Sequence, residues 1–158
     1  MGEHAIQSDE EIIRLLYKNL LESWNSNNAT GFAELFMPDG NCIGFDGSQM
    51  NGRREINDTI AKIFTNHKVA SYVGIVREVR LLGPAVFLLR AVAGMVPPGK
   101  TKINPEVNAI QTLIILKEQE QFRIALLQNT PAAFHEQPEL REALTEELQE
   151  VFDGGKIV

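Results

Sequence analysis

Residues 107–129 read V-N-A-I-Q-T-L-I-I-L-K-E-Q-E-Q-F-R-I-A-L-L-Q-N, and they predict two long strands joined by a short turn. The apolar runs 107–117 and 122–129 are rich in branched residues that favour strands, and the polar residues 118–121 separate them. Residues 69–82 and 85–96 have the same composition. We therefore expect four consecutive antiparallel strands in the second half of the chain.

Helical patterns occupy the first half of the chain. Ser8 and Glu11 form a capping box, and apolar residues then recur at helical spacing as far as Trp24. Asn28 is expected to cap a short second helix, and residues 53–66 are expected to form a third.

Shorter signals complete the expected order of elements. The tripeptide Pro38-Asp39-Gly40 predicts a turn, and residues 41–46 predict a short strand after it. A last helix is expected over residues 138–152, opened by Pro138 in its first turn.

Helices first and antiparallel strands afterwards indicate an α+β fold rather than alternating β-α-β units. We expect a single domain over residues 1–158, with a core at about 8–133 and the C-terminal helix added to it. Runs such as 113–116 lack polar alternation, so both faces of the sheet are expected to be covered.

Composition and charge exclude several classes of protein. The net charge of -6, with Arg53-Arg54 as the densest basic pair, argues against nucleic acid as a partner. The single cysteine, Cys42, excludes an intrachain disulfide and a cysteine-cluster metal site. The N-terminus has neither a signal-peptide nor a myristoylation pattern, and no apolar run approaches the about 20 residues that span a membrane. We therefore expect a cytoplasmic protein without a membrane partner.

The turn between the last two strands predicts which of their residues face each other. An even-numbered turn places Lys117 opposite Phe122, and continued pairing then places Gln111 opposite Gln128 on the buried face. These glutamines either bond to each other and close the sheet, or bind a ligand. Asn129 is expected to bond to the backbone at the end of the sheet. A bulge would reverse these orientations.

Other candidate site residues each have a structural alternative. Asp46 is either a turn residue before Gly47 or an acid–base group, and Asp39 is favoured as a turn residue. Trp24 belongs either to the core or to a ligand pocket, and its indole N–H needs a partner. Arg80 either pairs with Glu78 within the sheet or binds an anionic ligand group.

The sequence predicts no metal site and no cofactor. His4, His67 and His135 lack a second ligand at metal spacing, and no nucleotide fingerprint occurs.

Several short motifs occur in an order that resembles a known superfamily. They are S-W-N at 23–25, F-x-P-D-G at 36–40, D-G at 46–47, G-R at 52–53, V-R-x-L at 79–82, Q-T at 111–112 and Q-N-T-P at 128–131. The chain resembles the SnoaL-like and nuclear-transport-factor-two-like superfamily, and within it the SgcJ/EcaC family.

The resemblance implies a cone-shaped cystatin-like fold whose open end admits a small organic molecule, in a homodimer. The ketosteroid isomerases of the superfamily use a carboxylate base and a tyrosine, whose positions fall near Gly44 and Leu20 here. Two functions remain open. One is a cofactor-independent enzyme of the cyclase or isomerase type, with Asp46 as acid–base group and Gln111, Gln128 and Arg80 orienting a polyketide-like ligand. The other is a non-catalytic ligand-binding protein or dimeric scaffold.

The outer face of the predicted sheet indicates where a dimer would form. Thr112, Ile114 and Leu116 continue an apolar surface that one terminal helix covers only in part. We expect a homodimer through this face.

Overall fold

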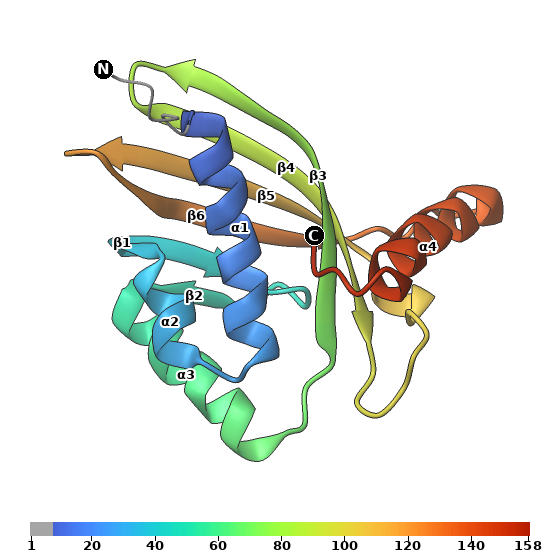
Figure 1. The fold of residues 1–158 in the computed structure, drawn as a ribbon. Helices are drawn as coiled ribbons and strands as arrows, with labels where there is room; N and C mark the ends of the chain where they lie inside the picture. Colours follow the sequence, from blue (N-terminus) through green and yellow to red (C-terminus); the bar gives the residue numbers. More distant parts are fainter. Residues whose placement is uncertain (1–7) are drawn as a thin grey trace.

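The computed structural model describes residues 8–158, and its elements occur in the predicted order (Figure 1). Residues 1–7 lie outside the described part of the chain. His4 and most of the segment inspected for a signal peptide and for myristoylation therefore lie outside it too.

The helices begin and end close to their predicted bounds. They are α1 (Asp9–Asn25), α2 (Ala29–Glu34), α3 (Arg53–Asn66) and α4 (Pro138–Asp153). Ser8 caps α1 in a complete capping box with Glu11, and the Asn28 side chain accepts a 2.9 Å hydrogen bond from the Gly31 N–H at the start of α2.

The strands form one six-stranded sheet of order β2-β1-β6-β5-β4-β3. They are β1 (Phe36–Ile43), β2 (Gln49–Asn51), β3 (Ser71–Gly83), β4 (Val86–Val96), β5 (Ala109–Glu118) and β6 (Gln121–Pro131). The four predicted strands correspond to β3 to β6, and they pair antiparallel in sequence order. β1 pairs parallel with β6, and a short 3-10 helix, η1 (Pro105–Val107), precedes β5.

Helices cover both faces of the curved sheet (Figure 1). The long helix α1 lies across one face, where Ile13, Tyr17 and Leu20 are fully buried against strand residues such as Leu113 and Ile124. α4 lies on the opposite face, and its residues Leu144 and Leu148 join a second cluster with Val73, Val96, Ile103 and Ala132. Both faces therefore carry a helix, but α4 covers the outer face only in part.

The predicted turn at Pro38-Asp39-Gly40 is wrong, because these residues belong to β1. The pairing of β1 with β6 shifts register between Phe36 and Asn41, so the chain bulges there without leaving the sheet. The Gly40 carbonyl accepts a 2.7 Å hydrogen bond from the Gly52 N–H, and the Phe36 carbonyl accepts hydrogen bonds from the Arg53 guanidinium. These partners form hydrogen bonds to the Gly40 and Phe36 carbonyls. In the predicted turn, hydrogen bonds within the turn itself would have taken their place.

The predicted register of the last hairpin is correct near the turn and wrong beyond it. Lys117 lies opposite Phe122 and Ile115 opposite Ile124, as expected. A β-bulge at Ala125 then shifts the pairing by one residue, so that Gln111 faces Asn129 and Thr112 faces Gln128. Since successive strand residues point to opposite faces, the extra residue reverses every orientation after it.

Glu78 forms an ion pair with Arg90 instead of with Arg80, its predicted partner. Glu78 lies opposite Arg90 on the neighbouring strand, and the Arg90 Nε is 2.6 Å from the Glu78 carboxylate. A directly opposite cross-strand partner is closer than a residue two positions along the same strand.

Candidate functional site

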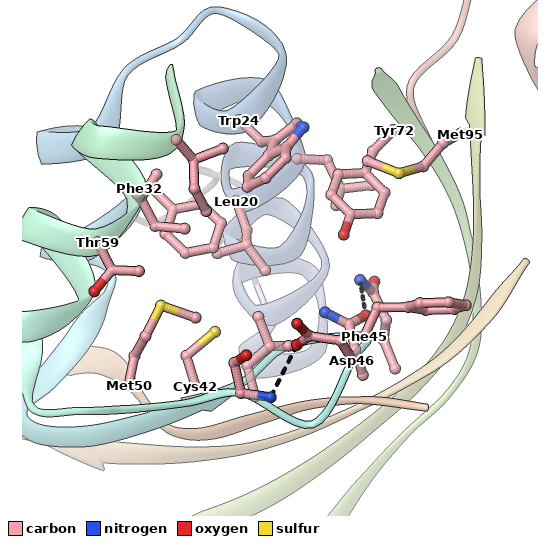
Figure 2. Close-up of a pocket in the computed structure, with 18 residues that line it drawn as sticks. Leu20, Trp24, Phe32, Cys42, Phe45, Asp46, Met50, Thr59, Tyr72 and Met95 are labelled. Carbon is pink, nitrogen blue, oxygen red and sulfur yellow. Dashed lines mark hydrogen bonds between the residues drawn. The ribbon is translucent and has the colours of Figure 1, made fainter. Parts of the chain in front are cut away.

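A cavity of about 370 Å³ lies between the N-terminal helices and the sheet. Trp24, Leu20 and Phe32 contribute its helical side, and Cys42 and Met50 lie on the strands below (Figure 2). The remaining walls are mostly apolar as well. The other lining residues are Leu21, Gly44, Phe45, Asp46, Ser48, Thr59, Ile60, Ile63, Tyr72, Met95, Gln111, Leu127 and Asn129.

A chain of uncharged hydrogen-bonding groups lies where the cavity meets the sheet. The Tyr17 hydroxyl donates to the Gln111 Oε1 at 2.6 Å, and the Gln111 Nε2 donates to the Asn129 Oδ1 at 2.8 Å. Gln111 is only 1% exposed, so these bonds satisfy a polar side chain that water does not reach. Burial strongly raises the pKa of the Tyr17 phenol, which stays protonated.

Tyr72 adds a second phenol to this end of the cavity. Figure 2 shows its hydroxyl pointing toward the interior of the cavity. Burial raises the pKa of Tyr72 to about 12, with a smaller upward effect from Cys42, and the Asn129 side chain lowers it in part. Tyr72 is therefore a neutral hydrogen-bonding group at physiological pH.

The end of α1 holds the Tyr72 backbone in place. The Asn25 side chain accepts a 2.7 Å hydrogen bond from the Tyr72 N–H and donates one of 3.0 Å to its carbonyl. The Trp24 indole N–H donates to the Ala70 carbonyl at 2.9 Å. The S-W-N motif at 23–25 thus joins α1 to the start of β3, while the Trp24 ring also lines the cavity. Both readings of Trp24, core residue and pocket residue, are compatible with this position.

Asp46 lies in the loop between β1 and β2, at the cavity rim. Its side chain is exposed, and its Oδ1 accepts a 2.9 Å hydrogen bond from the Ser48 N–H. Hydrogen bonds from Ser48 lower the pKa of the Asp46 carboxyl. A carboxylate in this state is a weak proton acceptor, because the ionised form is the one that its surroundings favour.

Two predicted ligand residues lie away from the cavity. Gln128 is exposed on the outer face of β6, because the bulge at Ala125 turns it outward. Arg80 is exposed on β3 opposite Leu88, on that same outer face. Neither side chain is among those that line the cavity. Asp39, the weaker of the two carboxylate candidates, is exposed in β1.

Sequence reasoning missed Asn129, Tyr72 and Tyr17 as site residues. Asn129 stands beside Gln128 in the Q-N-T-P motif, and only the bulge decides which of the two faces inward. The two tyrosines had a usable signal, because a phenol inside an apolar helix face or strand needs a hydrogen-bond partner.

Residues 8–158 contain neither a cluster of metal-ligand side chains nor a helix that could span a membrane. Within residues 8–158, no group of three or more histidine, cysteine, aspartate or glutamate side chains could hold a metal ion. In that same part of the chain, no helix has the length and apolar character needed to cross a membrane.

Comparisons with known proteins identify the fold. No family model matches the chain, and no curated protein sequence matches it. A domain of unknown function from Nostoc punctiforme with a cystatin-like fold is similar at 25% identity, over 94% of this chain and 95% of that one, with a TM-score of 0.78. An uncharacterised cystatin-like protein from Caulobacter vibrioides matches at 23% identity over 84% and 97%, with a TM-score of 0.68. This chain has the cystatin-like fold.

A third match has the same fold at lower sequence identity. A ketosteroid isomerase-like protein from Erwinia carotovora matches at 11% identity over 81% of this chain and 99% of that one, with a TM-score of 0.63. The cystatin-like fold is the one that the sequence resemblance implied.

Proposed function

We propose that this chain binds small, largely apolar and uncharged organic molecules in the cavity between α1, α3 and the sheet, and that it belongs to the SgcJ/EcaC family. The observation that carries the binding proposal is an apolar cavity of about 370 Å³ that ends in a row of neutral hydrogen-bonding groups. Cavities of this size and composition are typical of small-molecule sites. Apolar walls supply affinity, and a few fixed polar groups orient the ligand.

The charges around the cavity favour a neutral ligand. Among the lining residues that the structure describes, none is lysine, arginine or histidine. Asp46, the carboxylate at the rim, would repel an anion. An anionic ligand group would therefore enter the apolar interior without a partner, which is energetically costly.

Filling the cavity from α3 tests the binding proposal. Thr59 lines the cavity, whereas Thr65 is exposed on the same helix. The uncharged dye Prodan should bind the wild-type protein with a blue-shifted emission. Thr59→Phe should weaken this binding at least about fivefold by occupying the space, and Thr65→Phe should leave it unchanged. Equal affinity in all three proteins would refute the cavity as the site.

A second candidate function is acid–base catalysis by Asp46, favoured by its position at the cavity rim. Against it, the carboxyl has a lowered pKa. The positions equivalent to the isomerase base and tyrosine hold Gly44 and Leu20, which line the cavity without a functional group. Binding without catalysis is therefore the function that the site supports better.

Proton exchange at carbon distinguishes the two functions. A base at the cavity would accelerate exchange of the α-protons of 1-indanone in D₂O, followed by NMR. Binding alone predicts no acceleration over buffer. Acceleration that disappears in Asp46→Asn would establish the catalytic alternative instead.

We also propose that the protein forms a homodimer through the outer face of the sheet. On this face Leu88, Ile114 and Leu126 form a row across neighbouring strands, and Ile110 beside them is 40% exposed. The α4 cluster includes Val73 and none of the residues of that row. The uncovered apolar row suits a second copy of the chain.

A further inference from the structure

We propose that Tyr17, a residue outside the cavity, fixes the polarity of the binding site, so that the site donates hydrogen bonds and selects ligands with a carbonyl-type acceptor. This inference rests on the proposed function, because it specifies the ligand class of the same cavity. It follows from the direction of each hydrogen bond along the chain from Tyr17 to Gln111 and Asn129.

The direction is set at Tyr17, where the surroundings are most restrictive. Tyr17 has an exposure of 0%, and the acceptor found for its hydroxyl within residues 8–158 is the Gln111 Oε1, at 2.6 Å. A buried hydroxyl that only accepted would leave its hydrogen without a partner, at a cost of about 1–3 kcal/mol. Gly74 makes room for this contact, since a Cβ at that position would lie 2.5 Å from the Tyr17 oxygen. Tyr17 therefore donates.

The orientation of Gln111 follows from that donation. An amide has an acceptor oxygen and a donor nitrogen, and its orientation is assigned from its partners. With the oxygen facing Tyr17, the Gln111 nitrogen faces Asn129 and donates to its Oδ1 at 2.8 Å. The Asn129 oxygen is thereby occupied, and its NH₂ group is directed away from Gln111.

The last step concerns the two groups at the cavity. With its oxygen bonded to Gln111, Asn129 presents its NH₂ group to the cavity that it lines. The Tyr72 hydroxyl points into the same cavity and has a hydrogen that it can donate to a ligand (Figure 2). Both residues can therefore donate a hydrogen bond to a ligand in the cavity.

A site of this polarity discriminates between ligands of equal shape. A ketone, lactone or quinone oxygen accepts from Tyr72 and Asn129, with a gain that is typical of a neutral hydrogen bond. A ligand that has an N–H group and no acceptor would instead place its N–H against the N–H donor of Asn129. Next to Asn129 its hydrogen would lose water without an amide oxygen to bond to, because Gln111 already occupies the Asn129 Oδ1.

Three bicyclic probes of nearly equal shape test the ranking in the wild-type protein. They are 1-indanone with a carbonyl acceptor, indole with an N–H donor, and indene with neither, titrated by ¹⁵N NMR. We expect 1-indanone to bind about tenfold more tightly than indene, and indole to bind more weakly than indene. Equal affinities, or a preference for indole, would overturn the inference while leaving the binding function intact. Failure of all three to bind would overturn the proposed function as well.

The variant Tyr17→Phe tests the origin of the polarity. It keeps the ring and removes the hydroxyl, so the Gln111 and Asn129 amides are free to reverse. The preference for 1-indanone over indole should fall to within about threefold, although no atom in contact with the probe has changed. Leu148→Ala, in α4 on the opposite face, is the control for lost stability and should keep the wild-type ratio. An unchanged ratio in folded Tyr17→Phe would refute the role of Tyr17, and the wild-type ranking remains decisive if that variant does not fold.

Discussion

Asn129 and Gln128 are neighbours on β6 that face opposite sides of the sheet. The Asn129 side chain accepts from Gln111 at the cavity, whereas Gln128 is exposed on the outer face. Replacing each with leucine removes one side-chain amide, on two different surfaces of the sheet. The pair therefore tests whether the residue at the cavity, and not its neighbour on the outer face, contributes to the proposed binding.

Asn129→Leu should weaken Prodan binding and lower the free energy of unfolding by about 1–3 kcal/mol, because the buried Gln111 amide loses its acceptor. Gln128→Leu should change the binding constant less than twofold and the stability by less than about 0.5 kcal/mol. Dye titration and urea unfolding of the two variants check this. The reverse pattern would mean that Gln128 faces the cavity.

The protein should lose stability in alkaline solution, because it buries one thiol and two phenols in their protonated form. Burial raises the pKa of Cys42 from 9.0 to about 12 and that of Tyr72 from 10.0 to about 12, and it raises the pKa of Tyr17 as well. These groups keep their protons in the folded protein and release them in the unfolded chain. Their contribution is complete below the unfolded values and is lost as the pH rises through them toward the folded values.

The free energy of unfolding should therefore fall from about pH 9 to about pH 12. Urea unfolding at a series of pH values measures this slope. Cys42→Ala should make the slope less steep between about pH 9 and about pH 10, where the unfolded thiol ionises. An identical slope in that variant would contradict a buried, neutral thiol.

At the scale of the element, α4 is attached to the sheet by an apolar cluster and by an ion pair. Leu148 is fully buried against the outer face of the sheet. Arg77 on β3 makes two hydrogen bonds of 2.8 and 2.9 Å to the Glu147 carboxylate. These bonds lower the pKa of Glu147 against the opposing effect of burial, and they raise the pKa of Arg77. The ion pair is partly exposed, so solvent screens much of its strength.

Acid should weaken this attachment. Because the folded pKa of Glu147 lies below its ordinary value of 4.5, its contribution is present above that value and is lost as the pH falls through the folded pKa. Glu147→Gln should lower stability by less than about 1 kcal/mol at neutral pH and by a smaller amount at about pH 2.5. Urea unfolding at both pH values, with the exposed neighbour Glu146→Gln as control, measures the difference. An equal loss at both would show that the effect is not electrostatic.

The elements show what the sequence could predict and what it could not. The helix bounds were predictable, because caps such as Ser8 and Asn28 act within four residues of the chain. The strands β3 to β6 were predictable from composition, since branched apolar residues mark buried strands. These signals are local and need no knowledge of the neighbouring strands.

Register and site required contacts between distant segments. Nothing local marks Ala125 as a bulge, because it stands in an uninterrupted apolar run. The turn prediction at Pro38-Asp39-Gly40 failed because the parallel pairing with β6 holds that segment in the sheet. Of the site residues, Trp24, Asp46 and Gln111 line the cavity, whereas Arg80 and Gln128 do not. The latter two were misplaced because their orientation depends on pairing.

At the scale of the whole molecule, the sheet has two faces with different roles. One face contributes Gln111 and Asn129 to the cavity, and the other presents the apolar row of Leu88, Ile114 and Leu126 beside α4. A dimer through the outer face would leave the cavity accessible, because residues of the N-terminal helices and of the opposite face of the sheet line the cavity. Association and ligand binding should therefore be separable by mutation.

A charge at the centre of the apolar row should separate them. Ile114→Lys places an ammonium group between Leu88 and Leu126, and desolvating this group in a dimer would cost several kcal/mol. The variant should sediment as a monomer at micromolar concentration, where the wild type sediments as a dimer, and it should bind Prodan with unchanged affinity. Leu15→Lys is the control, because Leu15 is 46% exposed on α1 on the other side of the sheet, and it should remain dimeric. A monomeric wild type would contradict the dimer, and a dimeric Ile114→Lys would place the interface elsewhere.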